Sequence, residues 1–314
     1  MEKELSLHGG RAIPLLRLCA MIKRNGVAVM NQRTGNVGLA KETVEILKNK
    51  SYTNRNGETV DISASLDAAV NGTILYEHHQ NFPDQPPIPE VKPVIEITNE
   101  TTAVASKRLL DAGRADVVAL NFASARNQGG GFLAGAIAQE EDLCRASGLY
   151  NCLKRKPQFY NENILADDNF YTDSMIYSPK VPFFRDEHNL FLDKPFEVSI
   201  ISAPAPNVRA MKENDVLFEG TEEELDAFAE VLAGTIELRI RKILRVAALH
   251  GHKTLVLGAW GCGVFGNDPN IMAALFYGCL MDNSVFEHVC FAVYDTRTPP
   301  AVYEAFRDTI GKLQ

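Results

Sequence analysis

Short apolar runs alternate with amphipathic stretches along the chain from about residue 94 onward. Runs rich in apolar and β-branched residues predict buried strands, whereas apolar residues spaced three or four apart predict helices packed on a sheet. The expected strands are 94–98, 117–122, 175–178, 197–202, 254–258 and 289–294. The expected helices are 101–112, 134–154, 221–250, 269–282 and 300–313. This alternation predicts an α/β fold whose sheet is at least partly parallel and carries helices on both faces.

The first 90 residues show a different pattern, and we expect them to form an N-terminal helical extension packed on a core of residues 91–314. Apolar residues at helical spacing predict helices within 12–50, with a break at the polar segment 31–38. The proline-rich stretch 81–93 is expected to be an extended connector. Smaller expected features are strands at 60–62 and 73–76 and an irregular segment at 156–173.

Composition and charge limit the kinds of partner, location and metal site that we expect for this protein. The 314 residues are 46% hydrophobic and carry a formal net charge of −8, without a long Lys/Arg run, which disfavours a general nucleic-acid binder. No apolar run approaches the roughly 20 residues of a membrane span, and the first residues lack the layout of a signal peptide. The six cysteines form no CxxC pair or zinc-finger spacing, so we expect reduced thiols and a cytoplasmic protein without a bound metal.

The segment 127–145, NQGGGFLAGAIAQEEDLCR, is the most informative part of the chain. Its three glycines lie between the expected strand 117–122 and the expected helix 134–154, where a glycine-rich turn presents unpaired backbone N–H groups to an anion. A plain tight turn is the alternative, but it does not need three consecutive glycines. The sequence therefore favours a loop that holds a phosphate or diphosphate.

Two adjacent carboxylates, Glu140 and Glu141, follow this loop one to two turns inside the expected helix. An isolated pair of this kind is usually solvated, but these two have small or apolar neighbours. Adjacent helical residues are about 100° apart, so the two side chains cannot do the same work. We expect one of them to act on the reacting bond while the other orients a hydroxyl group or a water molecule.

A second glycine-rich loop, GAWGCGVFGN at 258–267, follows the expected strand 254–258. Either it is an ordinary strand–helix connection, or its N–H groups wrap a diphosphate while Phe265 stacks on a ribose or base. A GxGxxG frame is present, but the downstream acidic residue of a dinucleotide fold is not evident, which disfavours an oxidoreductase. Cys262 is expected to be small filler and Trp260 to pack under the loop. His250 and His252 lack a third ligand, so a capping or surface role is favoured over zinc.

The combination GGG, seven residues and QEE resembles the signature of the poly(ADP-ribose) glycohydrolases, and the likeness is greatest to their bacterial-type branch. It extends over nearly the whole chain and includes the helical N-terminus, the strand end SAPAPN and the GAWGCGVFGN loop. The resemblance implies a three-layer α/β/α macrodomain-like fold with a mixed sheet and an N-terminal helical extension.

The resemblance also implies roles for individual residues. Glu141 is expected to be catalytic, Glu140 to position the distal ribose hydroxyls or the scissile oxygen, and Asn121 to contact that ribose. Phe265 is expected to stack against the proximal ribose, and no motif fixes the residues that recognise adenine. The expected ADP-ribose contacts are Asn121, Asn127, Gly129, Gly130, Gly131, Gln139, Gly261, Cys262, Gly263, Val264, Phe265 and Gly266.

The function implied is hydrolysis of the ribose–ribose O-glycosidic bond of poly(ADP-ribose), with Glu141 as general acid and then general base. The expected partners are poly(ADP-ribose) or ADP-ribosylated substrates and the product ADP-ribose, without a cofactor or metal. Two alternatives stay open, which are hydrolysis of mono-ADP-ribose and binding of ADP-ribose without turnover. The QEE motif disfavours the second of these.

Overall fold

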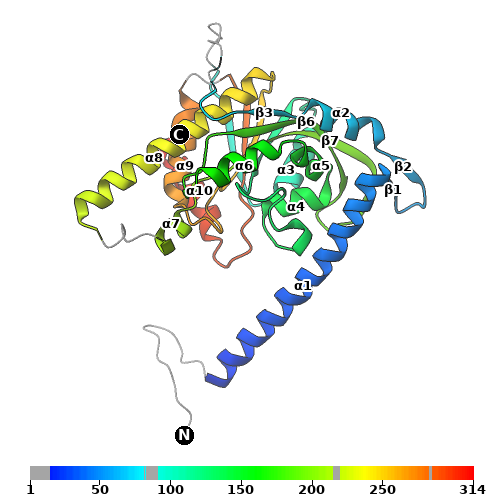
Figure 1. Ribbon diagram of the computed structural model, residues 1–314, viewed down its shortest axis with the longest axis horizontal. Helices are drawn as coiled ribbons and strands as arrows, with labels where there is room; N and C mark the ends of the chain where they lie inside the picture. Colours follow the sequence, from blue (N-terminus) through cyan, green and yellow to red (C-terminus); the bar gives the residue numbers. More distant parts are fainter. Residues whose placement is uncertain (1–14, 81, 83–90, 215–219, 283–284) are drawn as a thin grey trace.

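The computed structural model describes residues 15–80, 82, 91–214, 220–282 and 285–314, with side chains from residue 32 onward except that of Asn214. Its centre is a seven-stranded sheet of order β3-β6-β7-β5-β8-β9-β4. The part from β7 to β4 is parallel, while β3, β6 and β7 pair in antiparallel fashion. The expected α/β class with a mixed sheet and covering helices is confirmed (Figure 1).

The bounds of the elements are as follows. The strands of this sheet are β3 (Ile74–Tyr76), β4 (Val94–Thr98), β5 (Val117–Phe122), β6 (Met175–Arg185), β7 (Phe191–Ala203), β8 (Thr254–Leu257) and β9 (His288–Ala292), and a small separate sheet pairs β1 (Ser51–Thr53) with β2 (Thr59–Asp61). The helices are α1 (Leu15–Asn49), α2 (Ser63–Gly72), α3 (Thr102–Asp111), the 3₁₀ turn η1 (Phe132–Ala134), α4 (Gln139–Ala146), α5 (Leu149–Lys154), α6 (Pro157–Leu165), α7 (Val208–Asn214), α8 (Glu222–Leu249), α9 (Pro269–Met281) and α10 (Ala301–Leu313).

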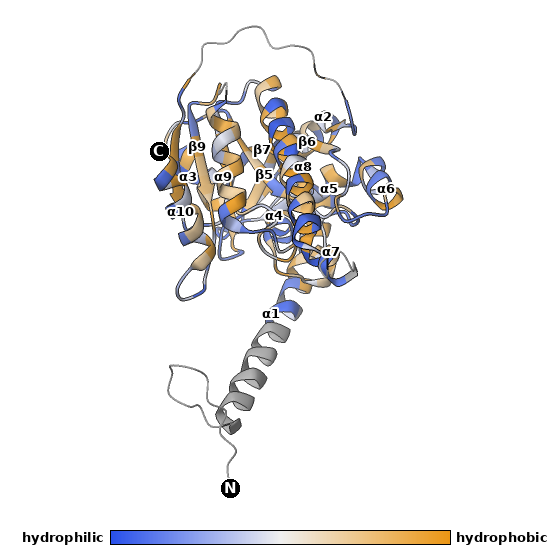
Figure 2. Cartoon of the chain, turned by 90° about the vertical axis from the view of Figure 1, so that its left-hand side faces the viewer, coloured by the Kyte–Doolittle hydropathy of each residue, from blue (hydrophilic) through white to orange (hydrophobic). Residues whose placement is uncertain are grey.

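The sheet separates two hydrophobic layers. Alternate residues of a strand point to opposite faces, so Val118 and Leu120 of β5 pack with α8, α9 and α10, while Val117 and Ala119 pack with α3, α4 and α5. Strands β5, β7 and β9 are hydrophobic and lie between helices that carry both hydrophobic and hydrophilic residues (Figure 2). This three-layer arrangement holds the carboxyl ends of the parallel strands at one edge.

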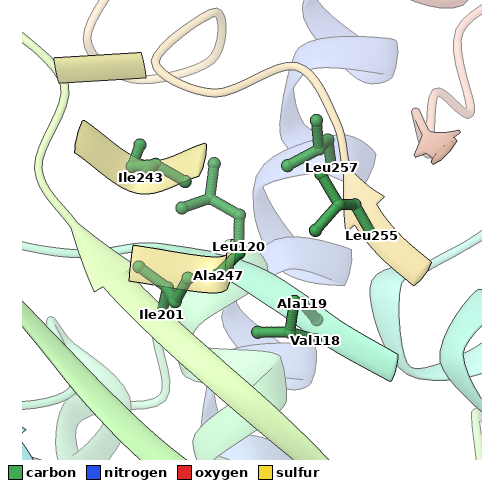
Figure 3. Close-up of a pocket in the computed structure, with 8 residues that line it drawn as sticks. All are labelled: Val118, Ala119, Leu120, Ile201, Ile243, Ala247, Leu255 and Leu257. Atoms are coloured by element: carbon green, nitrogen blue, oxygen red, sulfur yellow. The ribbon is translucent and has the colours of Figure 1, made fainter. Parts of the chain in front are cut away.

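A small apolar cavity of about 10 Å³ remains inside one layer, between β5, β7, β8 and α8 (Figure 3). Its lining consists of Val118, Ala119, Leu120, Ile201, Ile243, Ala247, Leu255 and Leu257. A buried water needs at least this much space and two or more polar partners, which these side chains do not offer. The cavity is therefore a packing defect of the core.

Most expected elements of the core are present, and their ends agree within a few residues. Strands β4 and β5 have the expected bounds, and Thr101 caps α3 by accepting a hydrogen bond from the Val104 N–H. Thr221 and Glu224 form a capping box that starts α8. Most of the expected connector 81–93 lies outside the described residues.

The break expected at 31–38 is wrong, because α1 is one continuous helix from Leu15 to Asn49. Glycine weakens a helix by about 1 kcal/mol but does not end it where tertiary contacts compensate. Here Ala40 is fully buried, and Thr43 donates a 2.8 Å hydrogen bond from its hydroxyl to the Arg145 carbonyl. Packing of α1 against α4 therefore overrides the local sequence.

The single helix expected at 134–154 is also wrong. Gly135 is left-handed and Ala138 is extended, so the first helix begins only at Gln139. Ser147 is extended as well and forms a bridge with Phe183, which separates α4 from α5. The two glutamates consequently lie in the first turn of α4 rather than one to two turns inside a helix.

The hydrophobic pattern also failed to predict several shorter helices and strands, or gave them the wrong length. The segment expected to be irregular at 156–173 contains α6, which starts with Pro157. Strands β6 and β7 are longer than expected because their pairing continues past register shifts next to Ser178 and Phe183. Elements that were not expected are α2, α7 and β1. Strand β3 lies within residues 1–90 yet forms an edge of the main sheet, and the division near residue 90 stays a prediction.

Within the described part of the chain, no helix has both the length and the apolar content needed to cross a membrane.

Candidate active site

Three neighbouring strands bring the expected site residues to one edge of the sheet. Strands β7, β5 and β8 are adjacent and parallel, so their carboxyl ends coincide. The loops that leave them are 123–138, 204–207 and 258–267. In open α/β sheets, ligands bind at such carboxyl ends. The two glycine-rich loops expected to act together therefore lie on the same side of the molecule.

The triple-glycine loop closes tightly over the two glutamates. Gly129 and Gly130 have φ values of +70° and +59°, which L side chains rarely adopt. A Cβ atom on Gly130 would overlap with Oε1 of Glu141 and would lie 2.9 Å from Oε2 of Glu140. Glycine is required at this position both by the backbone conformation and by the approach of the carboxylates.

Glu141 is held by the loop through one oxygen only. Its Oε1 accepts a 2.8 Å hydrogen bond from the Gly131 N–H. Its Oε2 is buried and has no hydrogen-bond partner among the described residues. The residue is 8% exposed, and an unpaired buried carboxyl oxygen is costly in a folded protein. This oxygen is therefore available to a ligand.

Glu140 is buried in a polar network at the end of β5. Its Oε1 accepts a 3.2 Å hydrogen bond from the Asn121 amide, and its Oε2 accepts a 2.8 Å bond from the Ser124 N–H. The Asn121 amide also donates to the Ser202 hydroxyl on β7 at 2.9 Å. Burial raises the pKa of Glu140 to about 8, although the Ser124 and Asn121 hydrogen bonds act in the opposite direction. Glu140 therefore holds a proton near neutral pH more readily than an ordinary glutamate.

Gln139 fixes the start of α4 to the sheet. Its amide oxygen accepts from the Phe122 N–H at 2.9 Å, and its amide nitrogen donates to the Leu120 carbonyl at 2.7 Å and to Thr102 at 3.0 Å. The side chain therefore sets the position of the two following glutamates. A direct contact of Gln139 with ADP-ribose stays a prediction, as does that of Asn127, whose carbonyl accepts from the Gly130 N–H within the turn.

The second loop presents free backbone donors. Among the described residues, the N–H groups of Gly263, Val264 and Phe265 have no hydrogen-bond acceptor. Gly261 has a φ of +75°, and a Cβ there would lie 2.6 Å from the Cβ of Ala205. Successive free N–H groups in a turn form an anion-binding concavity. The N–H groups at 263–265 are therefore available to a diphosphate, whereas those of Cys262 and Gly266 already donate to the carbonyls of Ala259 and Gly263. Contacts of Gly261, Cys262 and Gly266 with ADP-ribose stay predictions.

Trp260 and Cys262 support this loop as expected. Trp260 is fully buried and donates from its indole nitrogen to the Ala203 carbonyl at 2.9 Å, which ties the loop to the end of β7. Burial raises the pKa of the Cys262 thiol to about 12, so this cysteine is a poor nucleophile at neutral pH.

The capping role expected for the HxH motif is confirmed for His250, which is the C-cap residue of α8. A surface role is wrong for His252, which is buried and bonds the Tyr177 hydroxyl at 3.0 Å and the Asp116 carbonyl at 2.7 Å. His250 stacks on Tyr177 with ring centroids 3.5 Å apart. Both histidines therefore have a structural role through their contacts with Tyr177.

Four residues near the site were not identified from the sequence. Ser202 and the Ser124 N–H complete the network of Glu140. Tyr171 lies with its ring 6.1 Å from that of Phe265, and Arg239 is buried and donates to the Tyr171 carbonyl. Ser202 is the first residue of the strand end SAPAPN, but its contact with Asn121 and that of Arg239 with Tyr171 join segments that are far apart in the chain, so local patterns did not predict these contacts.

The arrangement combines two buried carboxyl groups, a polar network at the end of β5 and a set of free backbone N–H donors. In the described part of the chain, Glu140 and Glu141 do not belong to any group of three metal-ligating side chains. The geometry thus supports general acid–base chemistry on a bond next to a phosphorylated sugar.

Comparison with known proteins agrees with this chemistry. The model of a family described as microbial-type PARG, catalytic domain, matches residues 40–186, which include the triple-glycine loop and both glutamates. No curated protein matches the chain.

Several solved structures are similar over most of the chain. Poly(ADP-ribose) glycohydrolase from Thermomonospora curvata has 41% sequence identity and a TM-score of 0.77, with 88% of this chain and 99% of that chain covered. The structure of the same glycohydrolase bound to the inhibitor ADP-HPD has 40% identity and a TM-score of 0.76 over the same shares. The glycohydrolase from Deinococcus radiodurans in complex with ADP-ribose has 38% identity and a TM-score of 0.68, covering 79% of this chain and 97% of that chain. The similarity therefore includes structures that contain ADP-ribose or an inhibitor.

Proposed function

Because the chain belongs to the family of microbial-type poly(ADP-ribose) glycohydrolases, we propose that it cleaves the ribose–ribose bond with Glu141 as general acid and then general base. The activity of the family, release of ADP-ribose from poly(ADP-ribose), is the function of this chain. The observation that carries the residue assignment is the free, buried Oε2 of Glu141 beside the triple-glycine loop.

The Gly131 hydrogen bond decides which oxygen of Glu141 carries the proton. Oε1 accepts from a backbone N–H, so a proton on the carboxyl group belongs on Oε2. The same bond fixes the carboxyl plane, because η1 and the turn before it hold Gly131 in place. Glu141 is thus oriented before the substrate binds, which lowers the cost of reaching the reactive geometry.

Glu140 and Asn121 position the distal ribose of the substrate. Asn121 is fully buried, and its Oδ1 has no partner among the described residues, so it can accept a hydrogen bond from a ribose hydroxyl. Glu140 offers a second polar group to the same sugar. These two side chains determine where the anomeric carbon lies relative to Oε2 of Glu141.

In the proposed reaction Glu141 gives up one proton and later regains one from water. Glu141 donates its proton to the departing 2′-oxygen as the bond from that oxygen to the anomeric carbon of the distal ribose breaks. The electron pair leaves with the oxygen, and the distal ribose becomes an oxocarbenium-like species. A water molecule adds its oxygen to the anomeric carbon and returns a proton to Glu141, which restores the starting state.

The loop 261–266 holds the diphosphate in this scheme. Its free N–H groups at Gly263, Val264 and Phe265 bind the phosphate oxygens, and the Phe265 ring packs on the proximal ribose. The diphosphate is anionic, so its place near the distal ribose stabilises the positive charge that develops there.

The reaction class is tested by incubating the purified protein with poly(ADP-ribose) and, separately, with a mono-ADP-ribosylated peptide, and by following ADP-ribose release by chromatography. We expect release from the polymer. Release from the peptide alone would move the assignment to a mono-ADP-ribosyl hydrolase. Binding of ADP-ribose without release from either substrate would indicate a non-catalytic reader.

A further inference from the structure

Three metal-ligating side chains meet outside the candidate active site. His78 and His79 follow β3, and Asp173 precedes β6, which pairs with β3 through Tyr76 and Met175. Each residue offers one ligand atom, and these atoms all lie within 4.8 Å of one another. The two strands lie side by side at the edge of the sheet, which brings residues 94 positions apart into one cluster (Figure 1).

The backbone at this point turns both imidazole rings to the same side. Consecutive side chains of a strand point in opposite directions. His79 instead has a φ of +58°, a left-handed conformation that few residues other than glycine adopt. As a result the rings of His78 and His79 lie with their centroids 3.4 Å apart. Two imidazoles so placed can bind a single cation together.

Asp173 is oriented toward the histidines by its other contacts. Its Oδ1 contacts Nδ1 of His78 and accepts a 3.1 Å hydrogen bond from the His79 N–H. Its Oδ2 lies 3.3 Å from Nζ of Lys242, which also donates to the Glu77 carbonyl at 2.6 Å. Lys242 thus fixes one carboxylate oxygen and leaves the other to face the imidazoles, in the way that outer contacts orient metal ligands.

The cluster is more open to solvent on the side of the histidines than on that of the carboxylate. The carboxylate is 11% exposed, whereas the His78 side chain is 40% exposed, so an ion can enter from the histidine side. The Lys242 ammonium opposes a cation, and we expect weaker binding than in a site with two free carboxylates.

We propose that His78, His79 and Asp173 bind one divalent transition-metal ion of the Zn²⁺ type. Two imidazoles and a carboxylate suit Zn²⁺ and its neighbours, whereas Mg²⁺ and Ca²⁺ prefer oxygen ligands alone. Water completes the coordination on the exposed side. The ion takes no part in cleavage, because the site does not include either catalytic carboxylate.

The position of Asp173 gives the ion a structural consequence. Asp173 is two residues from Tyr171, whose carbonyl accepts from Arg239 and whose ring lies next to Phe265. An ion bound here ties the end of β3 to the segment that supports the loop 261–266. Metal binding is therefore expected to raise the melting temperature of the protein.

The experiment uses the full chain, freed of metal with a chelator and kept reduced. It is titrated with Co²⁺, whose visible absorption reports the coordination geometry, and the bound Co²⁺ is then displaced with Zn²⁺. We expect one Co²⁺ per chain, without the strong near-ultraviolet bands of cysteine thiolate ligands, and complete displacement by Zn²⁺. The absence of a Co²⁺ spectrum, or the presence of thiolate bands, would overturn the proposal.

Matched variants locate the site. His79→Asn keeps a residue type that tolerates a left-handed φ but shortens the side chain, and Asp173→Asn removes the charge. Each is expected to weaken Co²⁺ binding at least tenfold with an unchanged far-ultraviolet circular dichroism spectrum. His188→Ala removes an exposed histidine from the β6–β7 turn and should bind as the wild type does. Equal binding by His79→Asn, Asp173→Asn and the wild type would exclude the cluster.

Discussion

The backbone N–H of Gly131 donates a 2.8 Å hydrogen bond to Oε1 of Glu141. The bond closes the triple-glycine turn onto the first turn of α4, so the loop that we expect to contact the ribose and its phosphate also holds the proposed acid. This hydrogen bond therefore orients both the loop and the carboxyl group of Glu141. The role of the glycines can be tested by substitutions that leave both glutamates unchanged.

Replacement of Gly130 by alanine is expected to abolish this arrangement. The new Cβ would overlap with Oε1 of Glu141 at a φ of +59°, so the loop must move. We expect a loss of stability of about 1–3 kcal/mol and a loss of turnover larger than that instability explains. Gly57→Ala is the matched control, since Gly57 has a φ of +80° and nothing within 4 Å of the added atom. It should lower the melting temperature while leaving ADP-ribose release per folded molecule unchanged. Equal activity losses in the two variants would contradict the account.

Ser202→Ala tests the positioning of Asn121. The hydroxyl accepts a 2.9 Å hydrogen bond from the Asn121 amide, and without it the amide can rotate away from Glu140. We expect a stability loss of about 1 kcal/mol and a lower kcat. Ser199→Ala on the same strand removes a hydroxyl that bonds Tyr177 and the Lys180 N–H instead, and it should reduce stability without changing kcat. If both variants turn over as the wild type does, Ser202 has no positioning role.

The stability of the protein should depend on pH through Glu140. Burial raises the pKa of this group to about 8 in the folded protein, above its ordinary value of 4.5. The stability that the protonated Glu140 contributes is therefore fully present below the pKa of this group in the unfolded chain. It is lost as pH rises through the pKa of the group in the folded protein. Between about pH 5 and pH 8 the melting temperature of the wild type should fall relative to that of Glu140→Gln, which cannot ionise. Thermal unfolding across this range measures the effect, with Glu223→Gln in the exposed first turn of α8 as control. Parallel pH profiles for the wild type and Glu140→Gln would contradict the buried position of Glu140.

Arg239 connects three carbonyl groups that belong to the segment before β6 and to the segment after β7. It is buried and donates to the Pro204 carbonyl at 2.8 Å and to those of Phe170 and Tyr171 at 3.1 and 3.2 Å. Arg239→Met leaves these acceptors unpaired, and we expect a loss of about 3 kcal/mol together with weaker ADP-ribose binding.

Arg241→Met provides the comparison on the same helix. Arg241 forms exposed salt bridges with Glu237 and Asp282, so its loss should cost at most about 1 kcal/mol and leave binding unchanged. Denaturant unfolding and calorimetry distinguish the two variants. Unchanged ADP-ribose affinity in Arg239→Met would show that the residue supports the fold but not the site.

The elements that carry the site could be predicted because their signals are local. The mainly apolar run 117–122 begins directly after Asp116 and is followed by the polar segment 124–128, so β5 has the expected ends, and the three glycines begin at residue 129. The start of α4 could not be predicted in the same way. It depends on the left-handed Gly135 and the extended Ala138, and neither conformation is specified by the small apolar residues of this segment.

The other features of the site that could not be predicted depend on contacts between distant segments of the chain. The bond between Asn121 and Ser202 joins residues 81 positions apart, and that between Tyr171 and Arg239 joins residues 68 apart. Such pairs depend on which strands and helices become neighbours. The strand end SAPAPN, which begins at Ser202, could be singled out as a segment, but the order β7-β5-β8 is a property of the folded sheet, so the contacts of Ser202 and Arg239 could not be predicted.

The central claim is that Glu141 supplies the proton, and Glu141→Gln tests it most directly. Glutamine can still accept the Gly131 hydrogen bond but cannot donate an acidic proton from the second position. Release of ADP-ribose from poly(ADP-ribose) should fall by about 10²–10⁴-fold, while calorimetry shows ADP-ribose affinity close to that of the wild type. Near-normal release by the folded variant would contradict the assignment of Glu141 as the general acid.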